Sequence, residues 1–332
     1  MAIKKDTKRD TYIDFLRALG LLLLIGVHVN APEWYKPLRS FDVPLMVFIS
    51  AVCYKPIQGG YLAYGVKRLK RIYIPVFIFL CILFSITGIV STVTDYSIFT
   101  PSKIVGSFLL LNSPSIGYVW IMRVFLLMAL ITPFLDRVVK KVNWIIILLI
   151  IGLMILLQSV IVQSVYFIVN PAISFIFNEI IVYTIGYSPL VMLGLGISQF
   201  KKNELIISIL VLGLSVLACT IYNDWNFIPN QYKYPPTTFY IVYGLFASCL
   251  LWSFKNILSP YILSPFVIYL SRNSMWLYLW HIVPVYMIAP FNCIPNTWFL
   301  RYLIVVAIAI GLYWIYSQLT VYIPDRYRKY IS

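Results

Sequence analysis

Long apolar runs recur from one end of the chain to the other and restrict its folding more than any other feature. Windows of roughly 17 to 25 residues, the length an α-helix needs to cross a bilayer, fall at about 13–31, 42–58, 72–92, 118–136, 143–161, 179–199, 205–222, 236–254, 273–290 and 298–320. With 61% hydrophobic residues, 11% charged residues and a mean hydropathy of +0.88, the chain has too little polar surface to cover a soluble globule. We therefore predict an all-α polytopic membrane protein with about ten transmembrane helices.

Basic residues gather in every second connection between these windows. The basic segments are 4–9, 67–71, 137–141, 201–202, 255–272 and 326–329. Because cytoplasmic loops of membrane proteins carry an excess of Lys and Arg, this alternation predicts that both termini lie in the cytoplasm of a multi-pass membrane protein. The net charge of +15 is then a topology signal and an attraction to anionic lipid, and we expect no nucleic-acid partner.

Three stretches fit no crossing in this scheme. Residues 93–117 and 162–178 are only partly apolar, and we assign them to the outer interface or to re-entrant segments. Residues 255–272 are basic at both ends and are expected along the inner surface.

The chain shows no internal repeat and no hydrophilic run long enough for a soluble domain. We predict one transmembrane domain over residues 1–332. The first apolar window contains charges and is followed by no small-residue cleavage site, so it is expected to remain as an uncleaved first span. The cysteines stand singly in apolar runs, and we expect no metal site.

The first window, "IDFLRALGLLLLIGVHVNAP", carries three ionisable side chains. A charge inside a span costs at least about 2.5 kcal/mol on insertion scales and usually faces a polar cavity. Arg17 and His28 are eleven residues apart, about three helical turns, so both can line one shaft about 16 Å long. Asp14 is placed to pair with Arg17 one turn away. Alternatively, Arg17 extends to the inner headgroups and His28 lies in the outer interface.

The chain has two histidines, His28 and His281. The second, in "SRNSMWLYLWHIVPVY", is predicted near the middle of the bilayer. Neutral imidazole can act as a general base near physiological pH without bringing a permanent charge into the membrane. The alternative for His281 is a buried histidine whose only role is to hydrogen bond a neighbouring group.

A basic cluster, "GVKRLKRIYIP" at 65–75, precedes the third window. Arg68 and Arg71 are one helical turn apart, a spacing that lets two guanidinium groups converge on one phosphate. By itself such a cluster is also typical of an inner-face anchor. A cytoplasmic phosphate site, a polar shaft and a histidine near the far mouth together suit transfer of a group from a phosphorylated donor to an acceptor outside.

These features, with further matches along almost the whole chain, resemble the integral-membrane acyltransferase type 3 family, which O-acetylates surface polysaccharides and other acceptors from cytoplasmic acyl-CoA. The matching stretches are "YIDFLRALGLLLLIGVHVN" with its Arg-x10-His, "FDVPLMVFIS", the RxxR, "VWIMRVFLLMALITPFL", "YKYPP" at 232–236 and "LSRNSMWLYLWHI". The resemblance implies that His28 is catalytic, that Arg17 shares its pore and that Arg68 and Arg71 help to bind acyl-CoA. It also implies a location in a bacterial plasma membrane.

Further residues could line the site. Some family members have a tryptophan helix with a glutamate shortly after it. This chain has Trp120 and then Arg123, with no acid in that helix before Asp136, so the group that assists His28 stays open. Arg123 is a candidate for holding the carbohydrate or for stabilising an oxyanion, or it is an interfacial anchor. Asp14 and His281 complete this set of possible lining residues.

We therefore predict a membrane O-acyltransferase that moves an acyl group, expected to be acetyl, from acyl-CoA to a hydroxyl of a surface polysaccharide or lipid-linked glycan. His28 would be the general base, no metal would be needed, and a covalent acyl-histidine is an open variant. The chief alternative is an exporter of polysaccharide or lipid-linked glycan without chemistry, for which inverted repeats and paired broken helices would be expected. An intramembrane serine protease is poorly matched, because Ser188 is followed at once by a proline. A purely structural scaffold would leave the phased Arg17 and His28 unexplained.

Overall fold

A computed structural model describes residues 9–56, 59–94, 98–165, 167–262, 264–291 and 297–322. Within these ranges the backbone is helical or irregular and forms no strand, so the predicted all-α class is confirmed. The basic residues at 4–8 and 326–329, which helped to place both termini in the cytoplasm, lie outside the described residues. The sidedness of the termini therefore stays a prediction, as does the extent of a single domain over 1–332.

The first part of the chain contains α1, which ends beside His28, and five further helices. They are α1 Thr11–Val27, α2 Tyr35–Leu38, α3 Asp42–Val52, α4 Tyr61–Thr94, α5 Pro101–Phe108 and α6 Trp120–Val139. The side chain of Asp10 accepts hydrogen bonds from the backbone N–H groups of Tyr12 and Ile13 and so begins α1. α4 is one continuous helix, so Arg68 and Arg71 are separated by one real helical turn.

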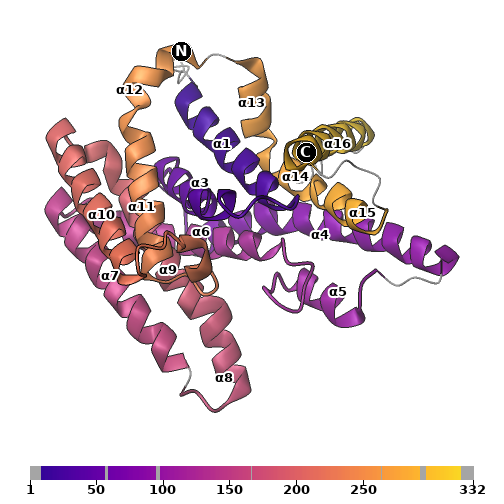
Figure 1. Cartoon of the computed structure of the whole chain (residues 1–332), viewed down its shortest axis with the longest axis horizontal. Coiled ribbons are helices and arrows are strands. Elements are labelled where there is room, and N and C mark those ends of the chain that lie inside the picture. The colour runs from indigo at the N-terminus through magenta and orange to yellow at the C-terminus, as the bar shows by residue number, and fades with distance from the viewer. Residues whose placement is uncertain are drawn as a thin grey trace.

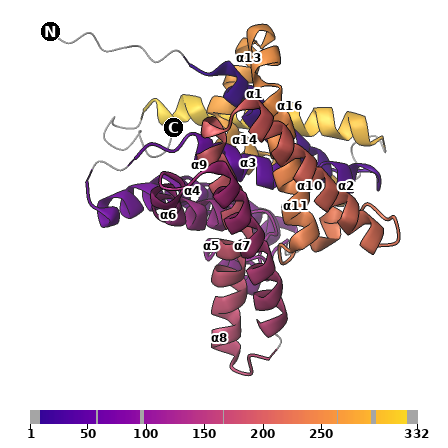
Figure 2. The ribbon, with the colours of Figure 1, turned by 90° about the vertical axis from the view of Figure 1, so that its left-hand side faces the viewer.

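The second part forms long helices and one short helix, α8. They are α7 Trp144–Val165, α8 Pro171–Ile176, α9 Val182–Gly196, α10 Lys202–Tyr222 and α11 Thr238–Ser253. A π-helical turn at Phe177–Ile181 joins α8 to α9, so residues 162–178 belong mostly to the ends of α7 and of this joined helix. α7 and the joined helix lie side by side and extend beyond the other helices (Figure 1, Figure 2).

The last part consists of short helices and one long one. They are α12 Lys255–Leu258, α13 Pro265–Arg272, α14 Ser274–Trp280, α15 Ile282–Phe291 and α16 Trp298–Thr320. α13 packs on α1, and α14 packs on α16 (Figure 1). Residues 255–272 thus form short segments, each too short to cross a membrane alone, and their position along the inner surface stays a prediction.

α9 lies at the centre of the packing. It contacts α3, α6 and α7, and most of its side chains, including Tyr183 and Tyr187, are buried. α7, by contrast, exposes a continuous set of leucine and valine side chains: Leu149, Leu153, Leu156 and Val160. Since a soluble protein rarely exposes so large an apolar surface, α7 is a lipid-facing helix.

Among the described residues, five helices are long and apolar enough to cross a membrane, or six if the bent pair Thr238–Ser253 and Lys255–Tyr261 is one span. The predicted count of ten is not confirmed. The predicted second span, 42–58, is wrong as a full crossing, because α3 has 11 residues and rises only about 16 Å against a hydrocarbon core of about 30 Å. The predicted ninth span is broken at His281, between α14 and α15.

Candidate active site

His28 lies directly after the last residue of α1, and the turn that ends the helix carries its imidazole to a cavity. The backbone N–H of His28 still donates to the carbonyl of Ile25, so the ring position is fixed by the helix end. The cavity has a volume of about 210 Å³, and its lining includes His28, Asn30, Tyr118 and Arg301. A half-buried imidazole at the edge of a cavity can exchange a proton with a bound ligand.

The second histidine meets the first. His28 Nδ1 lies 2.9 Å from Nε2 of His281. His281 is fully buried, and its Nδ1 is hydrogen bonded to the backbone carbonyl of Tyr278. The chain thus brings its two histidines into direct contact at the break between α14 and α15.

Aromatic side chains hold the segment before α6 against this pair. The ring of Tyr118 meets the His28 ring edge to face, with centroids 4.5 Å apart. The hydroxyl of Tyr278 donates to the backbone carbonyl of Tyr118 at 2.5 Å, and the hydroxyl of Tyr286 donates to that of Ile116 at 2.7 Å. These bonds fix one wall of the His28 cavity.

Three arginines gather near the other end of α1. Arg71 on α4 experiences the positive charges of Arg68 and of Arg17, so the predicted donor-binding pair and the predicted pore arginine lie near one another. The Arg68 guanidinium also lies over the Tyr64 ring, 5.1 Å from its centroid. In the described part of the chain none of the three arginines forms an ion pair. This group of arginines leaves positive charge for an anionic ligand.

The predicted ion pair between Asp14 and Arg17 is wrong. Asp14 pairs with Arg9 through two hydrogen bonds of 2.5 and 2.8 Å, and it accepts a third from Ser271 on α13 at 2.6 Å. Arg9 precedes α1 and can approach the buried carboxylate from the helix end, whereas Ser271 approaches from the neighbouring helix. Asp14 therefore fixes the start of α1 to α13 and leaves Arg17 uncompensated.

Arg123 and Trp120 lie on α6, in a second polar region. Arg123 is buried, donates to the backbone carbonyl of Leu110 at 3.1 Å and forms an ion pair with Glu179 at the start of the α9 region. Its guanidinium lies over the Tyr183 ring, 4.9 Å from the centroid. Trp120 packs edge to face on Tyr234 with centroids 5.1 Å apart. Glu179 thus supplies an acid beside Arg123, whereas α6 itself has none before Asp136.

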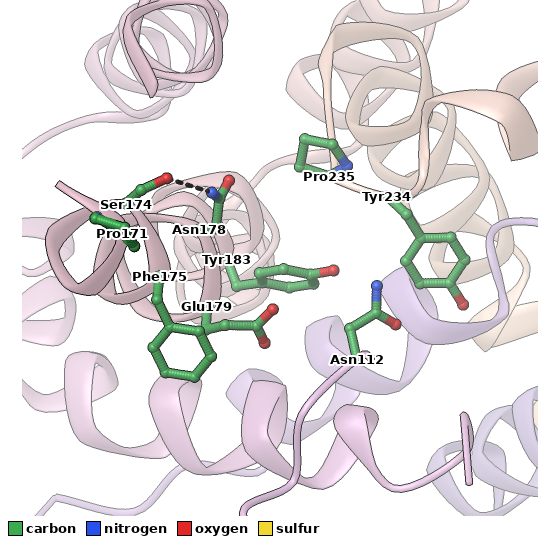
Figure 3. A pocket seen from close by; sticks show the side chains of 9 residues that line it. All are labelled: Asn112, Pro171, Ser174, Phe175, Asn178, Glu179, Tyr183, Tyr234 and Pro235. Atoms are coloured by element: carbon green, nitrogen blue, oxygen red, sulfur yellow. Dashed lines mark hydrogen bonds between the residues drawn. The ribbon is translucent and has the colours of Figure 1, made fainter. Parts of the chain in front are cut away.

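A larger cavity opens beside this region (Figure 3). Its volume is about 450 Å³, and it is lined by Asn112, Pro171, Ser174, Phe175, Asn178, Glu179, Tyr183, Tyr234 and Pro235. In Figure 3 the Tyr183 ring and the Glu179 carboxylate extend from one helix toward Asn112 on the opposite wall. Aromatic faces beside amide and carboxylate groups suit a polar ligand with apolar ring faces.

Lys233, in the connection between α10 and α11, is 6% exposed. Its ammonium lies 5.4 Å from the Trp120 ring centroid and 5.3 Å from that of Tyr234. Burial lowers the pKa of Lys233 to about 8, and the nearby Asp42 acts in the opposite direction. Lys233 also acts electrostatically on His28, as does Arg39, the partner of the buried Asp42. These two cations therefore connect the two polar regions.

Sequence reasoning missed Glu179, Lys233 and the Arg39–Asp42 pair. Glu179 opens a predicted apolar window, and the rule that an ionisable residue in a span marks function could have identified it. The three-residue spacing of Arg39 and Asp42 is a local sign of a helical ion pair. Lys233 lies in the matched stretch "YKYPP", but its burial could not be predicted, because it depends on how the connection folds over α6.

The comparisons with known proteins decide the family. A family model described as an acyltransferase domain, that of the acyltransferase type 3 family, matches residues 10–318. The chain belongs to the acyltransferase type 3 family. No curated protein and no solved structure matches the chain. The family and the apolar helices together identify a membrane acyltransferase.

Proposed function

We propose that this acyltransferase moves an acyl group, expected to be acetyl, from cytoplasmic acyl-CoA to a hydroxyl of a surface or exported polysaccharide at a bacterial plasma membrane. One observation carries the proposal: Arg17, Arg68 and Arg71 gather near one end of α1, while His28 faces a cavity at the other. The two ends are about 16 Å apart along the helix. A pantetheine arm can extend over such a distance from a phosphate site to a reacting thioester.

Coenzyme A carries its negative charge on phosphates, and the arginines are its proposed binding site. Arg68 and Arg71 are one turn apart on a continuous helix, which lets both guanidinium groups donate to neighbouring phosphate oxygens. Arg17 adds positive charge where the acylated arm would enter between α1 and α4. No metal is needed for this binding.

The proposed chemistry is a direct transfer with His28 as general base. His28 takes the proton of the acceptor hydroxyl as its oxygen attacks the thioester carbonyl carbon. The tetrahedral intermediate then breaks its C–S bond, and the departing coenzyme A thiolate takes the proton from the imidazolium. The products are an ester and free coenzyme A thiol. Arg301, on the same cavity wall, supplies positive charge for the developing oxyanion.

The larger cavity is the proposed acceptor subsite. Tyr183, Tyr234 and Phe175 offer aromatic faces, and Asn112 and Glu179 offer hydrogen-bonding groups of both kinds. Sugar rings have this combination of apolar faces and hydroxyl edges. Arg123, which is paired with Glu179, orients the carboxylate in this proposal.

The test is coenzyme A release by the protein in proteoliposomes supplied with labelled acetyl-CoA and a surface glycan. Wild type should release coenzyme A and label the glycan. The double variant Arg68→Ala/Arg71→Ala should raise the donor KM about 10- to 100-fold, because two charge-assisted contacts are lost. The control Lys67→Ala/Lys70→Ala removes the same charge from the same turn and should change the donor KM much less. A wild type that consumes none of a panel of acyl-CoAs would overturn the proposal.

A further inference from the structure

The contact between the two histidines has a defined geometry. The rings are nearly parallel, with an interplanar angle of 15° and centroids 5.1 Å apart. A 2.9 Å separation of Nδ1 and Nε2 gives nearly this centroid distance only when the rings meet edge to edge. The contact is therefore an in-plane N–H···N hydrogen bond, in which one ring donates and the other accepts.

The Tyr278 carbonyl decides which ring donates. A carbonyl oxygen can only accept, so the Nδ1 of His281 that faces it must carry the hydrogen. His281 is 0% exposed and forms no ion pair with any acid among the described residues, so a cationic form would be costly. A neutral His281 with its hydrogen on Nδ1 has a bare Nε2. The donor in the contact is therefore Nδ1–H of His28.

We propose that His281 is a positioning residue that holds His28 in the Nδ1–H tautomer, so that Nε2 of His28 carries the free lone pair. Nε2 is the ring nitrogen left for a ligand in the cavity, since Nδ1 is bonded. After His28 accepts a proton, its Nδ1–H still donates to His281, which stabilises the imidazolium. The catalytic role of His281 rests on the proposed general-base function of His28. The tautomer of His28 can be measured independently of that function.

The presence of only two histidines makes the tautomer directly measurable. Protein labelled with ¹⁵N-histidine in lipid nanodiscs shows the nitrogens of these two rings alone, and protonated and bare nitrogens have distinct chemical shifts. At neutral pH we expect both rings to be neutral with the hydrogen on Nδ1. An Nε2–H tautomer of His28 in the folded wild type would overturn the proposal.

Two substitutions separate positioning from packing. In His281→Gln the amide oxygen can accept from His28 and the amide NH₂ can donate to Tyr278, so His28 should keep its tautomer and kcat should stay within about tenfold of wild type. His281→Leu keeps the volume and removes both bonds, and we expect kcat to fall about 10²- to 10⁴-fold with little change in the donor KM. Wild-type kcat in His281→Leu would contradict the role.

The outcomes also separate this inference from the proposed function. If His28 has the expected tautomer but the protein consumes no acyl-CoA, the proposed function is wrong, whereas the control of the His28 tautomer by His281 is confirmed. If acyl transfer depends on His28 but His28 carries its hydrogen on Nε2, the proposed function is supported and only the proposed role of His281 is wrong. If His281→Leu does not fold, the wild-type spectrum and the kcat of His281→Gln still test the proposed role of His281.

Discussion

The Arg123 guanidinium on α6 pairs with the Glu179 carboxylate at the start of the α9 region, although 56 positions separate the two residues. Both side chains are mostly buried, and the pair joins two of the helices that pack most closely in the fold. It also fixes a carboxylate at the wall of the larger cavity. The two residues therefore contribute to stability and to the proposed acceptor site together.

Removal of either partner should leave a buried charge without compensation. We expect Arg123→Met and Glu179→Leu each to lower the free energy of unfolding by about 3–5 kcal/mol. The double variant should lose less than the sum of the two, because neither charge is then left alone. Unfolding of the wild type, both single variants and the double variant in detergent would measure these free energies. Additive losses of unfolding free energy would show that the two residues are not coupled. The pair Asp136–Lys140, in which the lysine side chain is 52% exposed, is the control and should contribute at most about 1 kcal/mol.

Gly194 should tolerate no side chain. A Cβ there would lie 2.5 Å from the Phe48 carbonyl oxygen and 2.8 Å from the Ala51 Cβ, both on α3. Gly194→Ala should therefore separate α9 from α3 and lower the melting temperature, at a cost of about 1–3 kcal/mol. Gly152→Ala on α7 is the matched control, since no atom lies within 4 Å, and helix propensity should make it neutral or slightly stabilising. Equal melting temperatures for the two variants would refute this packing.

Tyr234 offers an aromatic face to the proposed acceptor cavity. Tyr234→Ala should raise the acceptor KM about tenfold through lost stacking and leave the donor KM unchanged. Tyr222→Ala removes a tyrosine that is 87% exposed and serves as the control. A rise in the donor KM alone would place the acceptor elsewhere.

The buried Lys233 should make the free energy of unfolding rise with pH in alkaline solution. Burial lowers its folded-state pKa to about 8, below the ordinary lysine value of about 10.4, so between these pH values the unfolded chain binds more protons. The free energy of unfolding should therefore increase with pH across this window, by up to about 3 kcal/mol. Lys233→Met should remove this increase. Melting of wild type and of Lys233→Met at several pH values measures this increase. If the stabilities of the two proteins change in parallel with pH, Lys233 titrates normally.

The sequence predicted the helical class and a first helix over 13–31, which overlaps α1 at Thr11–Val27, because apolar length is a local property. It overestimated the second span because hydropathy does not locate a helix end. Lys55 and Pro56 could have ended that span earlier. It also began the third span too late, because the basic residues lower the hydropathy of a helix that starts at Tyr61.

The contacts that build the site could not be read from sequence. No periodicity connects His28 to His281, which are 253 positions apart, or Arg123 to an acid on another helix. Asp14 shows the limit of local reasoning even one turn away. Its neighbour Arg17 had the right spacing, yet Arg9 and Ser271 reach the carboxylate from outside the helix.

The most direct test of the account is acyl transfer by His28→Gln, which keeps a side chain of similar size that cannot take up a proton. The measurement follows labelled acetyl from acetyl-CoA to the glycan in proteoliposomes, with donor binding determined in parallel. We predict that transfer falls at least about 10²-fold while donor affinity stays within a few-fold of wild type. Transfer at the wild-type rate in a folded His28→Gln protein would contradict the central claim that His28 is the general base.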